Sequence, residues 1–237
     1  MKKIITLFAL LIVILTQISC GGGGGGGGDG ETAAGTLNTD PNKRTSGTGV
    51  RIIHASMDGE PVDLKIADQF YGNAYFMGET FYQTTPKGPL NLLLERANSP
   101  GVVLNTLISD LKDKTEYSVL LTGQNANQRY AATLLEEPVL KPAAGKAVIQ
   151  FIHALEGSGE LTLVGSVTLG PVSFKASSGF LEIPVPLSGT ESFNINSSSR
   201  TIATINVAVS DGSESTIVVG GSRNDGVIIP RVFRDRD

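Results

Sequence analysis

Val50-Arg51-Ile52-Ile53-His54-Ala55 is repeated 99 residues later as Ile149-Gln150-Phe151-Ile152-His153-Ala154. The two histidines of the chain fall at matching positions in these segments. A second match, at an offset of 98 residues, joins residues 111–122 (LKDKTEYSVLLT) to residues 209–220 (VSDGSESTIVVG). A near-constant offset over much of a sequence is the mark of an internal repeat. We therefore expect two copies of one structural unit in the 237-residue chain.

Each unit repeats its apolar residues with a period of two rather than 3.6. Residues 62–66 (VDLKI) and 192–196 (SFNIN) both alternate, which places apolar side chains on one face of a half-buried strand. Turn sequences such as residues 210–213 (SDGS) and 224–226 (NDG) separate the short strands. About seven strands per unit predict an all-β chain of two tandem Ig-like or fibronectin-like antiparallel β-sandwich domains.

The N-terminus has the pattern of an export signal. Lys2 and Lys3 precede a run over residues 4–15 that is apolar except for Thr6. This run is shorter than the roughly 20 apolar residues that a membrane-spanning helix needs, and it has the length of a signal-peptide core. The chain has one cysteine, Cys20, so it cannot form an intrachain disulfide.

Gln17-Ile18-Ser19-Cys20 resembles the cleavage box of bacterial lipoproteins. The resemblance implies cleavage before Cys20 and acylation of its thiol, with membrane attachment through the lipid. Gly21 follows Cys20, and in that family a residue other than Asp at this place implies the outer membrane of a Gram-negative bacterium. The alternative is an ordinary secretion signal with a free thiol.

Composition beyond Cys20 predicts a tether before the folded units. Residues 21–28 are eight consecutive glycines, which maximise backbone entropy and bury no side chain. Pro138 and Pro142 mark a short linker between the two units. The predicted organisation is a lipoprotein signal peptide (1–19), lipidated Cys and Gly-rich tether (20–48), first sandwich (49–137), linker (138–145) and second sandwich (146–237).

The opening of the first unit resembles a known family. Residues 50–56 (VRIIHAS), followed by Asp58, Pro61, Val62 and Asp63, are similar to the start of "domain of unknown function 4397". That family occurs in secreted and surface proteins of bacteria, often as tandem repeats, and implies no biochemical activity. The second unit keeps His153 but lacks the Asp and Pro turn that follows in the first.

Residues 111–117 (LKDKTEY) resemble the tyrosine corner of fibronectin-type sandwiches. The resemblance implies that the Tyr117 hydroxyl forms a hydrogen bond with nearby backbone and fixes the crossover between sheets. Ser215 stands at the matching position of the second unit, so we expect that corner to be lost there.

The histidines are the main candidates for chemistry. His54, with Asp58, Glu60 or Asp63 nearby, could form a metal or ligand site, because imidazole and carboxylate groups bind Zn²⁺. Alternatively, His54 and His153 are structural and close one end of each sandwich by bonding to backbone. A residue kept in both units while its neighbours change favours the structural role, and we predict no metal and no cofactor.

Other polar and aromatic groups are predicted to be surface or core residues. We interpret Glu136-Glu137 as a solvated pair beside the linker. Arg231, Arg234 and Arg236, which interleave with Asp235 and Asp237, are interpreted as a solvated C-terminal tail. The densest aromatic stretch is expected to fill the sandwich core rather than to form an exposed binding surface: Tyr71, Tyr75, Phe76, Phe81 and Tyr82.

The net charge of −4, without a cluster of Lys or Arg, argues against nucleic acid as a partner. No G-x-S-x-G elbow and no H-E-x-x-H motif occurs in the sequence. We therefore predict a membrane-anchored envelope lipoprotein that acts as a non-catalytic binding or structural module, with an envelope protein or a polysaccharide as partner. The alternative is an envelope hydrolase or metal-dependent enzyme that uses His54 and nearby carboxylates.

Overall fold

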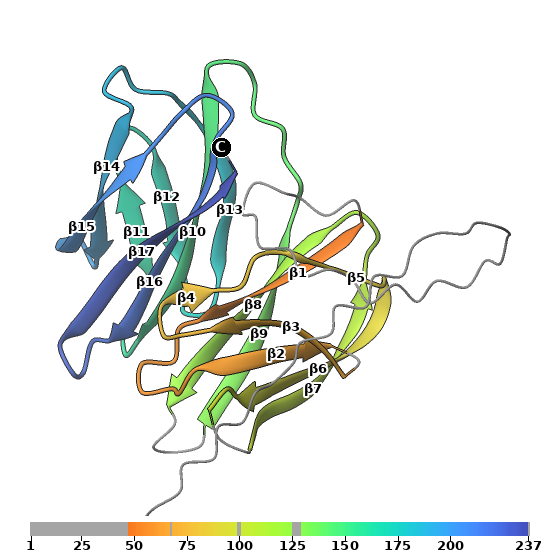
Figure 1. The fold of residues 1–237 in the computed structure, drawn as a ribbon. Helices are drawn as coiled ribbons and strands as arrows, with labels where there is room; N and C mark the ends of the chain where they lie inside the picture. The colour runs from red at the N-terminus through yellow and green to blue at the C-terminus, as the bar shows by residue number, and fades with distance from the viewer. Residues whose placement is uncertain (1–46, 67, 99–100, 125–128, 237) are drawn as a thin grey trace, which may run out of the picture. The chain divides into compact units, whose positions relative to one another are not determined.

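The computed structural model describes residues 47–236, apart from 67, 99–100 and 125–128 (Figure 1). The predicted signal peptide, Cys20 and nearly all of the predicted tether lie outside the described residues. Every regular element in the described part of the chain is a β-strand, which confirms the all-β fold class. No helix in the described ranges is long and apolar enough to cross a membrane.

The first sandwich contains nine strands in two sheets. One sheet has the order β3-β2-β6-β7, and the other has the order β4-β1-β8-β9 with β5 also paired to β1. The two short strands β4 and β5 account for the excess over the seven strands expected per unit. The strands are β1 (Thr48–His54), β2 (Val62–Ile66), β3 (Gln69–Ala74), β4 (Gly78–Glu79), β5 (Gln83–Thr85), β6 (Gly88–Arg96), β7 (Val102–Leu111), β8 (Glu116–Gln124) and β9 (Arg129–Glu137).

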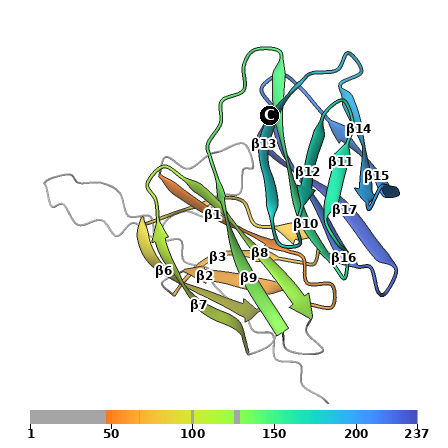
Figure 2. The same cartoon turned by 180° about the vertical axis from the view of Figure 1, so that it is seen from behind.

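The second sandwich has eight strands and repeats this topology. Its sheets have the orders β12-β11-β14-β15 and β13-β10-β16-β17, which match those of the first sandwich except that β13 alone takes the place of β4 and β5 (Figure 2). The strands are β10 (Lys146–Glu156), β11 (Leu161–Val164), β12 (Thr168–Val172), β13 (Ser177–Pro184), β14 (Thr190–Ser197), β15 (Arg200–Ala208), β16 (Glu214–Ser222) and β17 (Val227–Arg236).

One strand pair in each sandwich differs from the antiparallel pairing that the sequence predicts. β1 pairs in parallel with β8, from Gly49 opposite Glu116 to His54 opposite Leu121. β10 pairs in parallel with β16 in the same way. Parallel strands cannot be joined by a tight hairpin, and here β2 to β7 lie between β1 and β8 in the chain, as β11 to β15 lie between β10 and β16.

Each sandwich has its own apolar core. The alternation along β2 appears in its burial, because Val62, Leu64 and Ile66 are buried while Asp63 and Lys65 are partly exposed. The first core includes Val50, Ile52, Leu92, Leu94, Val119 and Leu121, and the second includes Ile149, Phe151, Leu163, Phe193, Ile195 and Ile217.

A third apolar cluster joins the two sandwiches. β1, β10 and β16 are buried along their whole length or nearly so, because the face turned away from each core packs against the other sandwich. The cluster comprises Ile53, Ala55, Met77, Leu120, Leu135, Ile152, Ala154, Val218 and Phe233. Its members form equivalent pairs from the two repeats, such as Ile53 with Ile152 and Leu120 with Val218.

Candidate functional site

Both histidines are completely buried near the ends of equivalent strands, β1 and β10. His54 Nε2 lies 3.0 Å from the carbonyl oxygen of Glu60, and His153 Nε2 lies 2.9 Å from that of Gly159. The ring nitrogen donates in each case, because a carbonyl oxygen can only accept. Burial lowers the pKa of both imidazoles, which favours their neutral form.

The carboxylates near His54 do not assemble around its ring. Glu60 offers its backbone carbonyl to the imidazole, while its side chain lies 3.7 Å from Arg96. Asp63 accepts a hydrogen bond from Asn73 at 2.9 Å. A Cβ at Gly59 would lie 2.6 Å from Cε1 of His54, so the chain packs closely over the ring. In the described part of the chain, no group of three His, Cys, Asp or Glu residues is placed to hold a metal ion.

The hydroxyl of Tyr117 accepts a hydrogen bond from the backbone N–H of Lys112 at 3.0 Å. Tyr117 is buried in the first core, and it ties the start of β8 to the segment that follows β7. Ser215 is its counterpart in the second sandwich and is also buried.

The largest set of buried polar side chains in the described residues lies between the two sandwiches rather than at the histidines. We call it the Arg51 cluster, and it draws side chains from β1, β4, β8 and β9 of the first sandwich and β10, β16 and β17 of the second. Its members are Arg51, Glu79, Tyr82, Ser118, Glu137, Gln150, Thr216 and Asp235.

One guanidinium holds three carboxylates together in the Arg51 cluster. The side chain of Arg51 is 1% exposed and forms ion pairs with Glu79 at 2.8 Å, with Glu137 at 3.3 Å and with Asp235. The ring of Tyr82 stacks on it, with 4.5 Å between Cζ and the ring centroid, and the Tyr82 hydroxyl donates to Glu137. Asp235 belongs to the second sandwich, so this ion pair links the two units directly.

Hydroxyl and amide groups complete the bonding of these charges. Arg51 donates through Nε to Ser118 Oγ at 2.6 Å and through Nη2 to Thr216 Oγ1 at 2.9 Å. Gln150 donates to Thr216 Oγ1 at 3.0 Å and also to Glu137. Buried charges are tolerated only when such partners replace water, and the cluster meets this condition across the whole interface.

The Arg51 cluster follows the internal repeat. Arg51 and Gln150 occupy equivalent places, and Glu79 bonds Arg51 as Ser177 bonds Gln150, at 3.1 Å. Two further equivalent pairs, each 98 residues apart, are Ser118 with Thr216 and Glu137 with Asp235. The two sandwiches thus meet through the same face of the repeated unit, in the manner of a two-fold dimer.

The pKa values of three groups in the Arg51 cluster depart from their ordinary values. Burial raises the pKa of Glu79 to about 8, against the opposing effect of Arg51. Burial also raises the pKa of Asp235 above its usual value. Burial opposes the charge on Arg51, but Asp235 and the other acids raise its pKa beyond the ordinary value. The guanidinium therefore stays charged, while Glu79 and Asp235 hold their protons to a higher pH than free carboxyl groups do.

Two interpretations from the sequence are wrong at this interface. Glu137 is the last residue of β9 and is 1% exposed, so it is not part of a solvated pair. Asp235 is 4% exposed within β17, so the C-terminal residues form a strand rather than a solvated tail. The surroundings differ from those expected because each carboxylate meets the other sandwich, Glu137 at Gln150 and Asp235 at Arg51.

Four residues of the aromatic stretch lie in four different surroundings rather than filling one core. Tyr71 packs partly buried against the first core, whereas Phe76 packs against the apolar cluster between the sandwiches. Tyr82 belongs to the Arg51 cluster. Tyr75 is 64% exposed, so it contributes to neither core.

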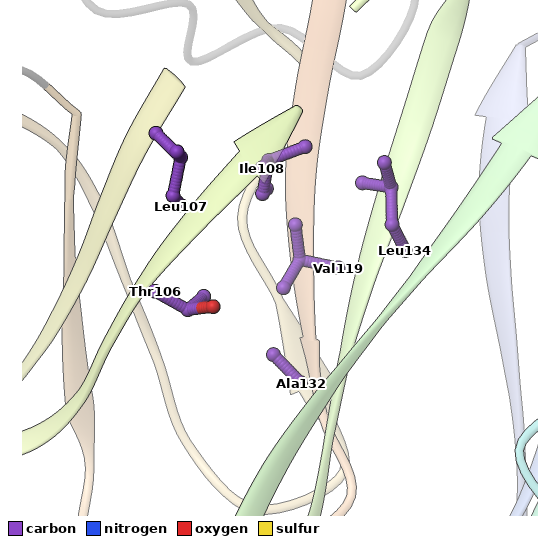
Figure 3. Close-up of a pocket in the computed structure, with 6 residues that line it drawn as sticks. All are labelled: Thr106, Leu107, Ile108, Val119, Ala132 and Leu134. Atoms are coloured by element: carbon purple, nitrogen blue, oxygen red, sulfur yellow. The ribbon is translucent and has the colours of Figure 1, made fainter. Parts of the chain in front are cut away.

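An apolar groove of about 240 Å³ lies on one side of the first sandwich, between β7 and β9 (Figure 3). Its lining consists of Thr106, Leu107 and Ile108 from β7, Val119 from β8, and Ala132 and Leu134 from β9. With Leu107 at 66% exposure, the groove opens beside an exposed apolar side chain. It can accept an apolar group, but it lacks an acid or base for chemistry.

Comparison with known proteins agrees with the family resemblance. Residues 48–164, which span β1 to β11, match the family model "Domain of unknown function (DUF4397)". This part of the chain is therefore similar to the domains of that family. The match to DUF4397 ends at Val164, and the kinship of the remaining second sandwich to the first rests on strand order and register. A search of curated proteins found no match.

Similar solved structures include two carbohydrate-binding modules. A family 26 module from Eubacterium rectale Amy13K, in complex with maltoheptaose, shares 13% identity, with 79% of this chain and 96% of that chain covered and a TM-score of 0.23. A streptococcal family 41 module that recognises α-glucan shares 8% identity, with 72% and 92% covered and a TM-score of 0.22. Such low TM-scores support no inference about a ligand of this protein.

The Arg51 cluster is the feature of this protein that sequence reasoning missed. One signal was present, because Glu137 and Asp235 are both acidic and lie 98 residues apart, at the offset of the repeat. Arg51 within the first-strand motif was a second signal, since a charged residue interrupts an otherwise apolar strand.

Proposed function

We propose that this protein is a lipid-anchored, non-catalytic module of the bacterial cell envelope, which binds an envelope protein or a polysaccharide. The anchor is the lipid on Cys20, and Gly21 beside it favours the outer membrane of a Gram-negative bacterium. The glycine run that follows separates the folded part from the membrane surface.

One observation carries the non-catalytic assignment: both imidazoles and the acids of the Arg51 cluster are bonded within the protein. His54 and His153 bond to carbonyl oxygens, and the acids nearest Arg51 bond to its guanidinium. A general base must reach a substrate proton directly or through one water molecule, which a completely buried and bonded imidazole does not do. The alternative of a hydrolase or metal enzyme that uses His54 requires an open pocket at that ring, and the packing of Gly59 over the ring opposes one.

Metabolic labelling with palmitate tests the anchor. The wild-type chain should incorporate label and partition into detergent, whereas Cys20→Ala should do neither. A Ser46→Ala variant, which changes a residue outside the cleavage box, should label like the wild type. Equal labelling of the wild type and Cys20→Ala would contradict the lipid anchor.

A binding assay tests the module assignment separately. The purified protein should retain an envelope protein from solubilised membranes or be retarded in gels that contain envelope polysaccharide. The binding should survive in His54→Asn, where the amide keeps hydrogen-bonding capacity. Hydrolysis of ester or glycoside substrates by the wild type, together with its loss in His54→Asn, would overturn the non-catalytic assignment.

A further inference from the structure

β7 is an edge strand with an unusual surface. It pairs with β6 on one side, and within the described residues no strand pairs with its other edge. Figures 1 and 2 both show β7 at the outer limit of its sheet, beyond β6. Its backbone N–H and C=O groups on that edge are therefore available to another strand.

Two large apolar side chains on β7 face outward. Leu107 is 66% exposed and pairs across the ladder with Asn91, and Val102 is 60% exposed and pairs with Glu95. The register shifts between Leu94 and Glu95, so an extra residue, Val103, enters β7 there. This irregularity places Val102 on the same outer face as Leu107, although the two are five residues apart.

The segment from Val102 to Ile108 (VVLNTLI) carries no charged residue. Edge strands normally avoid unwanted pairing through charges, proline or bulges. β17 carries Pro230 and Arg231, and β15 begins at Arg200. Residues 102–108 of β7 thus lack charge and proline, two of the devices that keep an edge strand from pairing.

The second sandwich supplies an internal comparison. By ladder register, Thr201 opposite Asn196 corresponds to Val102, and Asn206 opposite Ser192 corresponds to Leu107. The repeated unit therefore has polar side chains on β15 at the two places where β7 is apolar. The unit folds with either set, so the apolar residues of β7 are not required by the sandwich itself.

We propose that β7 is the dimerisation strand of this protein and pairs antiparallel with β7 of a second copy. The partner strand has to be extended, uncharged and apolar on its outer face, and residues 102–108 of β7 meet these requirements. Pairing about Asn105 places Leu107 of one copy opposite the bulge at Val102 and Val103 of the other. Apolar side chains then face each other on both sides of the two-fold axis, and no like charges meet.

Pairing of β7 with its own copy gives a closed dimer rather than an open-ended assembly. Antiparallel pairing of a strand with its own copy uses the same edge on both partners and ends with a dimer. The groove of about 240 Å³ beside β7 lies where inward-facing side chains of the added strand, such as Leu104 and Ile108, would extend the first core. Continuation of the four-stranded sheet across the axis would give one of eight strands.

Analytical ultracentrifugation of the full chain in detergent, over a concentration series, tests the proposal. The wild type should sediment as a dimer, and Val102→Thr/Leu107→Asn, which installs the residues of the second sandwich, should weaken dimerisation by at least about tenfold. Leu187→Asn, which removes a fully exposed leucine elsewhere, should leave the dimer intact. Circular dichroism should show unchanged folding in both variants.

Cross-linking tests the register. In a Cys20→Ala background, Asn105→Cys should form a disulfide-linked dimer under mild oxidation, because the two residues meet at the axis. Thr204→Cys, at the equivalent exposed position of β15, should remain monomeric. A monomeric wild type, a dimer unaffected by the double substitution, or equal cross-linking of both cysteines would overturn the proposal.

Discussion

Arg51 shows how a single residue can organise a surface between two repeats. Its side chain bonds to three acids and two hydroxyl groups and stacks on an aromatic ring. Its neighbours along β1, Val50 and Ile52, are apolar. The equivalent residue, Gln150, is neutral and forms fewer of these bonds. The first copy of the repeat therefore supplies the positive charge, whereas the acids that surround it come from both copies.

Removal of the guanidinium should be costly. Arg51→Met retains much of the apolar volume but leaves Glu137 and Asp235 buried without their ion-pair partner. Breaking a buried pair on one side costs about 3–5 kcal/mol, so the free energy of unfolding in urea should fall by this amount. Arg231→Met, which changes an exposed arginine on β17, should alter it by no more than about 0.5 kcal/mol. Equal stability of the two variants would mean that the cluster contributes nothing.

The raised pKa of Glu79 predicts a pH dependence of stability. The carboxyl holds its proton up to about pH 8 in the folded protein and releases it near its ordinary pKa when unfolded. Asp235 shifts in the same direction. The free energy of unfolding should therefore fall as the pH rises from about 5 to about 9, with the last loss near the folded pKa.

Glu79→Gln should flatten this dependence while leaving stability near pH 5 almost unchanged. Urea denaturation of both proteins across the pH series measures the difference. Glu136→Gln, which alters an exposed carboxylate bound to Lys112, should retain the slope of the wild type. A free energy of unfolding that increases with pH in the wild type would contradict the raised pKa of Glu79.

The residues of the Arg51 cluster mark the limit of sequence reasoning at this scale. Charged residues are exposed in most proteins, so Glu137 at the end of a strand and Asp235 near the C-terminus were reasonably placed in solvent. Their burial depends on a partner surface almost 100 residues away in sequence, which alternation within a strand does not encode. The role of the histidines was easier to predict, because both units keep a histidine while its neighbours change. That pattern favoured a structural role, and the hydrogen bonds to carbonyl oxygens support it.

At the scale of elements, the sequence predicted strands best where one face meets a core and the other meets solvent. β2 shows this alternation clearly. β1 and β16 do not, because both of their faces are buried, and their apolar runs indicate a strand without indicating what covers its second face. The parallel pairing of β1 with β8 was also missed, since pairing direction between distant strands leaves no local pattern.

Tyr117 provides a prediction at the level of a connection. Its hydroxyl accepts from Lys112 N across the turn between β7 and β8, so Tyr117→Phe leaves that N–H without its partner while preserving the apolar packing. The free energy of unfolding should fall by about 1 kcal/mol in urea denaturation. Tyr75→Phe, which removes the hydroxyl of a tyrosine that is 64% exposed, should have no measurable effect. Equal effects of the two substitutions would show that the corner adds no stability.

At the scale of the whole molecule, the repeat explains why two sandwiches adhere. The face that joins them consists of equivalent pairs, such as Leu135 with Phe233 in the apolar cluster and Glu137 with Asp235 among the charges. Such an isologous contact is what two separate copies of one unit would form as a dimer. Duplication within a single chain places both copies at high effective concentration, so the face is occupied without a second molecule.

This shared face predicts cooperative unfolding of both sandwiches. Separation of the two would expose the apolar cluster and the buried acids together, so neither sandwich should unfold alone. Differential scanning calorimetry should show one transition, with a calorimetric to van't Hoff enthalpy ratio close to one. Phe233→Asp, which places a charge in the apolar cluster, should divide it into two transitions, whereas Val139→Asp at an exposed linker position should not. Two transitions in the wild type would show instead that the sandwiches are energetically independent, in spite of the Arg51–Asp235 ion pair that connects them.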